Sequence, residues 1–473
     1  MKKIFITFFV LVFLALVAAI GGAPYWFGME TEKAYDAVLQ APANESAATL
    51  TPVSYDRGWF SSTVQTKIQY RGIPTVFMAT SQVSHGPFPL SRILSDSQFT
   101  PVKSQIHSEI VVVADPRASE TQAWVQLPPV TVDTVIAMNG SGESRLAYPA
   151  NKKTTDAQSL SWQAGSGIIT FDADMNKINV NLQMPEFMFK DVHQQITLKN
   201  VSTDSSSYKS DSGYRLDNTH IKIGATDFVA LPEGDSPLKP AFTVNGLRIS
   251  DVTTETGNNL NLSFEYGFKD LHVVNQSFGP AQLKLEVRKL DRPTLVAFGK
   301  TLGELFKQNL PAEQLGALAT GKMIDLLADL AKKSPELEIT KFGLTTSDGE
   351  IQGKAKLAVD GSNLNVRENP MLLVGALSGE GEISLPGALV ETIVKKQVQN
   401  EIEALKVSGK LKPAEVEKLT PQKESDIADK VLPQRVQAFA AKFKMVPTDS
   451  RFQINASFNH GQLLVNNQPF KMP

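Results

Sequence analysis

Two stretches of the sequence carry the residue types of a phosphate-binding loop. GALATGKM, at 316–323, has the glycine spacing and the lysine of a P-loop, whose backbone amides cradle nucleotide phosphates. Such a loop must follow a strand and hold magnesium through a Ser or Thr, whereas this stretch lies within a helical period and ends in Met323. AFGKT, at 297–301, lacks the first glycine of the motif. We therefore expect no nucleotide to bind.

The residues used by hydrolases and metal sites are scattered along the chain. GSGES, at 140–144, has the wrong order for a nucleophile elbow and is typical of a hairpin turn, and DADMNK, at 172–177, lacks the glycine and the glutamate that complete a calcium loop. The six histidines stand singly, without HxxxH or HExxH spacing: His85, His107, His193, His220, His272 and His460. We expect no catalytic residue, no cofactor and no metal. Two alternatives remain, a triad or metal set assembled from distant residues and a pair of carboxylates in an envelope hydrolase.

One pattern combines glycine turns with Arg, Trp and His: YDRGWFSSTVQTKIQY, at 55–70, followed by VSHGPFPLSRIL, at 83–94. Glycine permits a tight bend, the aromatic residues can pack on a sheet, and the arginine can bond carbonyls or a carboxylate. The structural interpretation, which we favour, is a sheet corner. The functional one is a recognition cluster of Arg57, Trp59 and His85. In a corner, Gly58→Val lowers the folded yield and His85→Ala is mild. The residues of the pattern are Arg57, Gly58, Trp59, Phe60, His85, Gly86 and Pro87.

The N-terminus favours a retained signal-anchor. Two lysines precede an apolar run at 4–20, and extended to Ala23 this run reaches about 20 residues, the length that spans a hydrocarbon core. Cleavage after Ala23 would place Pro24 beside the cut, which disfavours processing, although a cut after Gly21 remains open. The lysines favour a cytoplasmic N-terminus. The expected anchor residues are Ile4, Phe5, Phe8, Phe9, Leu11, Phe13, Leu14 and Leu16, with Tyr25, Trp26 and Phe27 as an aromatic belt.

Composition limits the partners of the protein. The formal net charge is −2, so the chain has no basic excess for nucleic acid. The absence of cysteine excludes zinc–thiolate sites, thiol nucleophiles and iron–sulfur clusters. A second apolar span of about 18 residues is also missing. These features predict a single-pass protein with one body outside the membrane.

The remaining sequence predicts an α+β fold after one N-terminal transmembrane helix, with antiparallel strands built as hairpins and with inserted helical pairs. A period of two runs from about 50 to 287, as in STVQTKIQY, where Val64, Thr66, Ile68 and Tyr70 share one face. Helices are expected at 29–40, in a pair at 291–334, and at 387–405, 413–419 and 433–444. The expected segments are an anchor at 1–28, a β-rich region at 29–290, a helical pair at 291–334, a β-hairpin region at 335–386, a helical region at 387–445 and a C-terminal hairpin at 446–473.

Several stretches together resemble the YdgA-like family of bacterial proteins. They are the N-terminal anchor, RGWFSS, HGPFPL, PELEITKFGLTTSDGEIQGKAKLAVDG and GQLLVNNQPF. The resemblance extends over nearly the whole chain. It implies association with the inner membrane, exposure to the periplasm, self-association and no defined biochemical activity.

A tethered sheet with one apolar face must cover that face. We expect either a lipid or another apolar ligand bound in a groove of the sheet, or self-association as a homodimer. The alternatives are an envelope scaffold without a ligand and, less favoured, the carboxylate-dependent hydrolase. By fold-level analogy the architecture is similar to that of AsmA-like envelope proteins, and the analogy implies a groove that handles lipids.

Overall fold

The computed structural model of the protein describes residues 21–40, 48–70, 75–113, 127–154, 158–230, 239–274, 276–306, 312–361, 372–408 and 420–470. Within these ranges antiparallel strands dominate and several helices are inserted between them, which confirms the α+β class. The chain forms two compact units. Unit 1 comprises Met1–Gly224, Val229–Leu238 and Gly299–Leu315, and unit 2 comprises Ala225–Phe228, Lys239–Phe298 and Gly316–Pro473.

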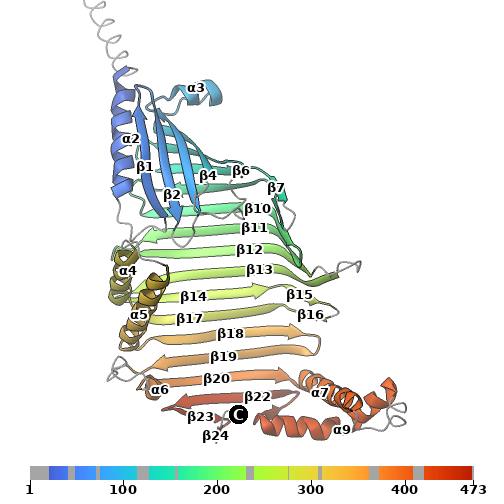
Figure 1. Cartoon of the computed structure of the whole chain (residues 1–473). Coiled ribbons are helices and arrows are strands. Elements are labelled where there is room, and N and C mark those ends of the chain that lie inside the picture. Colours follow the sequence, from blue (N-terminus) through green and yellow to red (C-terminus); the bar gives the residue numbers. More distant parts are fainter. Residues whose placement is uncertain are drawn as a thin grey trace, which may run out of the picture. The chain divides into compact units, whose positions relative to one another are not determined.

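Unit 1 contains an antiparallel sheet whose first strands follow chain order (Figure 1). Its strands are β1 (Ala48–Arg57), β2 (Ser61–Tyr70), β3 (Val76–His85), β4 (Val102–Val113), β5 (Val130–Ala137), β6 (Gly142–Tyr148), β7 (Asn151–Thr154), β8 (Gln158–Trp162), β9 (Gly165–Phe171), β10 (Lys177–Asp191), β11 (Gln194–Lys209) and the first part of β12 (Arg215–Ala230). From β1 to β6 each strand pairs with the next. β6 pairs next with β9. β8 and β9 both pair with one edge of β10, and β11 pairs with the other edge of β10. β7 pairs with β8.

The first helix, α2 (Ala23–Gln40), packs against β1 to β4. It begins before the expected Met29 because Pro24 lies in the first turn, where a helix has no use for its missing N–H. Beneath the helix, the alternation predicted for β2 is confirmed at Val64 and Thr66, which are both buried. The hydroxyls of Tyr35 and Thr66 are hydrogen-bonded at 2.7 Å. A short helix, α3 (Leu90–Asp96), lies at the same end of the strands as the start of α2 (Figure 1).

Unit 2 contains a second run of antiparallel strands, together with residues Ala225–Phe228 of β12. They are β13 (Lys239–Thr256), β14 (Asn259–Phe268), β15 (Asp270–Val273), β16 (Gln276–Phe278), β17 (Ala281–Asp291), β18 (Glu336–Thr346), β19 (Gly349–Val359), β20 (Leu377–Pro386), β21 (Val446–Thr448), β22 (Arg451–Asn459), β23 (Gln462–Val465) and β24 (Gln468–Pro469). The pairing order is β13, β14, β17, β18, β19, β20, β22, β23, β24. The hairpin expected around Ser347 and Asp348 is the β18–β19 hairpin.

The predicted helical pair is confirmed as α4 (Arg292–Phe306) and α5 (Ala312–Ala331). Asp291 caps α4, since its Oδ2 accepts the backbone N–H of Thr294 at 3.0 Å. The P-loop-like stretch, 316–323, lies inside α5, so its amides are used in the helix and cannot surround a phosphate. A short helix, α6 (Leu372–Ala376), precedes β20.

Two further helices form a pair in unit 2. α7 (Gly387–Val407) begins where the sequence predicts, and α9 (Pro421–Lys442) packs against it. The prediction that the last helix starts at Pro433 is wrong, because Thr420 and Pro421 supply an earlier cap and first turn and Pro433 lies inside the helix. The helix expected at 413–419 lies outside the described residues. Buried Val390, Val394 and Val398 form the inner face of α7.

The predicted anchor falls mainly on residues 1–20, which are outside the described part of the chain. Among the helices that the structure does describe, none combines the length and the apolar character needed to cross a bilayer. The transmembrane helix therefore stays a prediction from the sequence.

Candidate functional site

The RGWF and HGP stretches lie together at one end of unit 1. The turn at 58–60 joins β1 to β2, and Gly86 follows β3. Because Ser61 pairs with Ser84, both stretches lie at the same end of the strands. The backbone amide of His85 donates to the carbonyl of Phe60 at 2.9 Å, and that of Gly86 donates to the carbonyl of Lys103 at 2.8 Å. The pattern is thus one assembly formed from two turns.

Two glycines of this assembly are required by close backbone contacts. A Cβ on Gly58 would lie 2.8 Å from the carbonyl oxygen of Ser61, which accepts the Gly58 amide. A Cβ on Gly86 would lie 1.9 Å from the carbonyl oxygen of Val102. The next residue, Pro87, accepts the amide of Val102 at 2.9 Å. A side chain at either glycine must displace backbone, which is the physical reason to expect that Gly58→Val lowers the folded yield.

Arg57 and Trp59 hold the first turns of α2. The Arg57 Nη1 donates to Glu32 Oε2 at 2.6 Å, and its guanidinium lies 5.1 Å from the centre of the Tyr25 ring. The Tyr25 and Trp59 rings are 4.9 Å apart. The indole N–H of Trp59 donates to the carbonyl of Gly21. These contacts fasten the start of α2 to the β1–β2 turn.

His85 lies between the sheet and α2 and is only 2% exposed. Its Nε2 is 2.8 Å from Ser62 Oγ and its Nδ1 is 3.2 Å from the carbonyl oxygen of Trp59. Since a carbonyl only accepts, Nδ1 carries the proton and Nε2 accepts from the serine hydroxyl. Burial lowers the pKa of His85 below 6.5, and the positive charge of Arg57 lowers it further. Hydrogen bonds to backbone carbonyls raise the pKa, but they do not offset this decrease. The ring is therefore neutral at pH 7.

The imidazole fills the space above Gly28 of α2. A Cβ on Gly28 would lie 2.5 Å from His85 Cε1 and 2.6 Å from its Nδ1. Arg57, Trp59 and His85 are therefore brought together, but to hold a helix and with no ring nitrogen left free for a ligand. The expectation that His85→Ala is mild has to be revised, because this side chain is a buried, doubly bonded part of the core.

The three residues of the expected aromatic belt have different surroundings in the structure. Tyr25 packs on Trp59 and Arg57, and Phe27 is buried at 7% exposure. Trp26 is exposed. Phe27 thus belongs to the protein core, because helix α2 starts before the belt and carries it onto the sheet. The remaining expected anchor residues, Ile4 to Leu16, lie outside the described residues.

The same face of β2 that α2 covers continues into an apolar pocket. Ile68 and Tyr70 follow Thr66 along this face, beyond the Tyr35 contact. The cavity measures about 350 Å³, within the range of small-molecule sites. We call it the Tyr70 pocket. It is lined by Ile68, Tyr70, Phe77, Ile110, Val112, Leu127, Pro128, Val130, Leu146, Tyr148, Pro149 and Trp162.

The Tyr70 pocket offers few polar groups. The Tyr148 hydroxyl donates to the carbonyl of Gln183 at 2.6 Å, and the Trp162 indole N–H donates to the carbonyl of Pro149 at 2.9 Å. Burial raises the pKa of Tyr148. The Tyr70 and Phe77 rings meet edge to face at 5.9 Å. An occupant of this pocket is therefore recognised by apolar contact and not by charge.

Unit 2 presents an extended apolar surface. Across its strands the register places Phe264 beside Leu285, then Ile339, then Ala355, and the same row continues through Gly381 and Ala456. Parallel rows contain Leu337 and Leu357, which are 40% and 37% exposed. We call this surface the apolar face of unit 2. It leaves large aliphatic side chains in contact with solvent.

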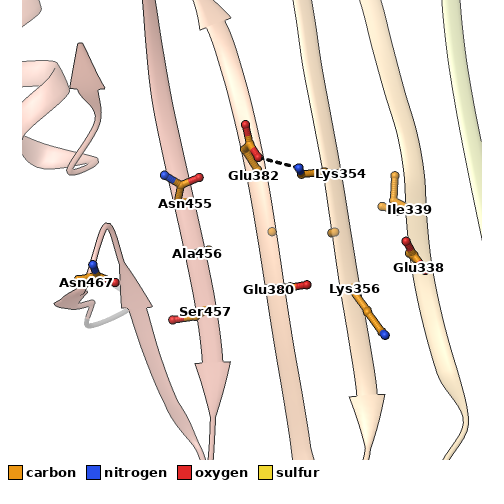
Figure 2. Close-up of a pocket in the computed structure, with 12 residues that line it drawn as sticks. Glu338, Ile339, Lys354, Lys356, Glu380, Glu382, Asn455, Ala456, Ser457 and Asn467 are labelled. Carbon is orange, nitrogen blue, oxygen red and sulfur yellow. Dashed lines mark ion pairs between the residues drawn. The ribbon is translucent and has the colours of Figure 1, made fainter. Parts of the chain in front are cut away.

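The opposite side of these strands is charged. A depression on this side measures about 370 Å³. Figure 2 shows its polar side chains, which come from β18, β19, β20 and β22 and from Asn467 between β23 and β24. Lys354 and Glu382 are paired at 3.0 Å. Glu338 pairs with Arg288 at 2.7 Å, and Lys356 lies 3.4 Å from Glu336. These side chains already neutralise one another. These ion pairs account for most of the charged side chains that line the depression.

Carboxylates meet in another depression, in unit 1. It measures about 660 Å³ and is lined by Asp133 and Glu143, together with Arg92 and Arg145. Asp133 lies 2.7 Å from the Nδ1 of His107, and Glu143 lies 2.7 Å from Arg145. These side chains are exposed, so the depression lacks the dry environment that sets a carboxylic acid apart from a carboxylate. These two carboxylates therefore lack the surroundings of an acid–base pair.

Metal-ligating side chains are similarly dispersed across the described ranges, where no group of three or more is placed to hold a metal. His107 and His272 each contact one aspartate, Asp133 and Asp270. The turns at 140 and 172 are hairpin turns between β5 and β6 and between β9 and β10, as the sequence predicts for the first of them.

Comparison with known proteins gives one match. A family model described as a bacterial protein of unknown function, DUF945, matches residues 1–473. The chain belongs to the DUF945 family. Neither the curated proteins nor the solved structures contain a match. The family match covers both units of this DUF945 protein and carries no assigned activity.

The Tyr70 pocket is the part of this DUF945 protein that sequence reasoning missed. Its lining comes from β2 to β6 and from β8, so no local motif marks it. The only sequence signal was the alternation that places Ile68 and Tyr70 on the covered face of β2. The conspicuous residues, Arg57, Trp59 and His85, hold α2 in place at the other end of the same strands.

Proposed function

We propose that this DUF945 protein is a non-catalytic envelope protein, tethered to the bacterial inner membrane, that binds a lipid acyl chain in the Tyr70 pocket. The observation that carries the proposal is the lining of that pocket, in which every side chain is aliphatic, aromatic or proline. Exposed apolar cavities of this kind mark binding sites in soluble proteins. An acyl chain has matching chemistry, since it presents only methylene groups.

The hydrogen bonds around the pocket disfavour polar ligands. The Tyr148 hydroxyl and the Trp162 indole N–H already donate to backbone carbonyls, so neither can donate to a sugar, a nucleotide or a peptide backbone. The Tyr70 hydroxyl is the one other polar side-chain group among the lining residues. A polar ligand would lose its hydration without gaining hydrogen bonds, at a cost of about 1–3 kcal/mol for each buried group. An acyl chain loses no hydrogen bonds on entry.

The tether rests on the N-terminal sequence. The apolar run at 4–20, preceded by Lys2 and Lys3, supports a single-pass signal-anchor with a cytoplasmic N-terminus and a body in the periplasm. The resemblance to YdgA-like proteins supports the same topology. A tether of this kind would keep the Tyr70 pocket near a source of lipid.

Self-association is a second candidate, favoured by the apolar face of unit 2. Leu337 and Leu357 are exposed neighbours in adjacent strands, and a copy of the chain could cover them. A stable dimer would bury at least about 1,000 Å² there. The two candidates use different units, so they can be separated experimentally.

The proposal is tested by native mass spectrometry of the detergent-extracted full chain, followed by lipid extraction. We expect about one phospholipid per chain. Val112→Phe, which narrows the pocket, should reduce the bound lipid at least fivefold. Val111→Phe is the matched control, because Val111 lies on the opposite, exposed face of β4, and it should retain the lipid.

Two results would contradict acyl-chain binding. One is a chain that purifies without lipid. A lipid-free dimer would support self-association, and a lipid-free monomer would leave only a scaffold role. The other is an equal loss of lipid in the Val112→Phe and Val111→Phe variants. Thermal unfolding of both variants shows whether a loss comes from misfolding. If Val112→Phe does not fold, the milder Val112→Leu replaces it in the same comparison.

A further inference from the structure

Helix α3 turns two leucines away from the sheet and keeps two polar side chains towards it, while its third apolar residue, Ile93, is half-buried. Ser91 faces the sheet, where its hydroxyl lies 3.1 Å from both Ser84 Oγ and Gln105 Oε1. The Nε and Nη1 atoms of Arg92 are shielded from solvent. Leu90 and Leu94, one turn apart, point outward and are 59% and 81% exposed. A helix that turns its leucines away from the protein requires another apolar phase.

Other exposed apolar side chains surround the leucines at the same end of unit 1. We call the set the apolar tip: Trp59, Phe60, Phe88, Leu90, Leu94 and Phe99. The strand register places them together. Trp59 and Phe60 form the turn before β2, the segment from Phe88 to Leu94 follows β3, and Phe99 precedes β4, whose Ser104 pairs with His85.

The start of α2 lies at this end as well. The indole N–H of Trp59 donates to the carbonyl of Gly21, so a residue of the apolar tip touches the point where the described chain begins. The sequence that leads to Gly21 is the apolar run at 4–20. Trp26, in the first turns of α2, is exposed too. The apolar tip therefore lies at the point where the predicted anchor joins the described chain.

We propose that the apolar tip is a membrane-contact surface, which inserts Trp59, Phe60 and the leucines of α3 into the interface of the same bilayer that holds the N-terminal segment. This inference rests on the proposed tether and does not depend on the Tyr70 pocket. Trp and Phe favour the level of the lipid headgroups, and an amphipathic helix lies there with its apolar face buried by about 5–10 Å.

The charges near the tip agree with this orientation. Arg57 is paired with Glu32. Arg92 lines the depression that also contains Gln105 and Asp133, where its Nε and Nη1 are buried without a hydrogen-bond partner, so its guanidinium is not directed at the bilayer with the leucines. A second copy of the chain is a poorer occupant, because the anchor leaving Gly21 already brings a bilayer to this surface. Contact at the tip would hold the strands of unit 1 at a defined angle to the membrane.

The absence of cysteine makes a direct test possible. A nitroxide label is placed on Leu94→Cys in the full chain, reconstituted in nanodiscs of phosphatidylethanolamine and phosphatidylglycerol. The matched control is Val192→Cys, an apolar residue in the β10–β11 turn of unit 1 that is 61% exposed. Both substitutions replace exposed side chains, so neither threatens the fold.

Power-saturation measurements compare the access of oxygen and of a water-soluble nickel chelate to each label. We expect oxygen to reach the Leu94 label better than nickel does, by at least threefold, and nickel to reach the Val192 label better. Equal nickel access at both positions would overturn the contact while leaving the tether standing. A chain that separates from the nanodiscs would overturn the tether and the contact together. Lipid in the Tyr70 pocket is measured separately and does not enter either result.

Discussion

Gly28→Ala should weaken the packing of α2 on the sheet of unit 1, although alanine normally favours a helix. In an exposed helix the exchange stabilises by about 1 kcal/mol. Here the new Cβ would lie 2.5 Å from His85 Cε1, and the ring cannot move away because Ser62 and the Trp59 carbonyl hold it. Overpacking of this kind costs about 1–3 kcal/mol. The sign of the substitution is thus reversed by one buried contact.

Hydrogen exchange of peptides from α2, followed by mass spectrometry, measures this effect locally. A loss of about 1–3 kcal/mol corresponds to exchange that is roughly 5- to 150-fold faster. The control is Gly321→Ala in α5, where an added Cβ meets no atom within 4 Å, and exchange there should be slower by a few-fold.

A double-mutant cycle makes the prediction specific. Removing the ring in His85→Ala should itself cost about 2–4 kcal/mol, from the lost packing and two lost hydrogen bonds. In that background Gly28→Ala should stabilise α2, because the space of the ring is empty. Unchanged or slower exchange in the Gly28→Ala single variant, or equal effects of Gly28→Ala in both backgrounds, would refute the reasoning.

Three further predictions follow from the geometry. Because burial holds the pKa of His85 below 6.5, the unfolded chain takes up a proton at acidic pH more readily than the folded chain does. The stability from this group should therefore be complete above about pH 6.5 and decrease as the pH falls below it. Thermal unfolding at pH 7.5 and 5.5 measures this difference, and His85→Gln should reduce it. Arg57→Ala should speed exchange in α2 by roughly fivefold, as it removes both the Glu32 pair and the Tyr25 contact, whereas Arg57→Lys should lose only part. Val390→Ala, at a fully buried position of α7, should destabilise that helix by about 2 kcal/mol. Ile393→Ala, on its exposed side, should cost less than about 0.5 kcal/mol. Equal hydrogen-exchange rates in α7 of these two variants would contradict the assigned inner face.

Local patterns in the sequence were sufficient for much of the fold. The periodicity that predicts α4 and α5, and the alternation in β2, are confirmed because each element buries one face that its own residues define. Boundaries were less predictable at prolines. Pro24 and Pro421 stand in first turns and permit helices that start early, and Pro433 sits inside α9.

The candidate site was harder to predict from the sequence, because its contacts join distant parts of the chain. Nothing near His85 in the sequence indicates that Gly28 lies against its ring. The sequence of the RGWF and HGP stretches indicated a structural corner, but it did not indicate that α2 packs against them. The Tyr70 pocket depends on strand register from β2 to β8, which single-sequence patterns do not specify.

The central claim, that an acyl chain occupies the Tyr70 pocket, is tested most directly by photocrosslinking in cells. A benzoylphenylalanine replaces Phe77, which lines the pocket, and as a control replaces Tyr208, an exposed residue at the end of β11. After irradiation, mass spectrometry of the purified chain should show a phospholipid adduct at position 77 and none at position 208. No adduct at position 77, or equal adducts at both positions, would contradict the account.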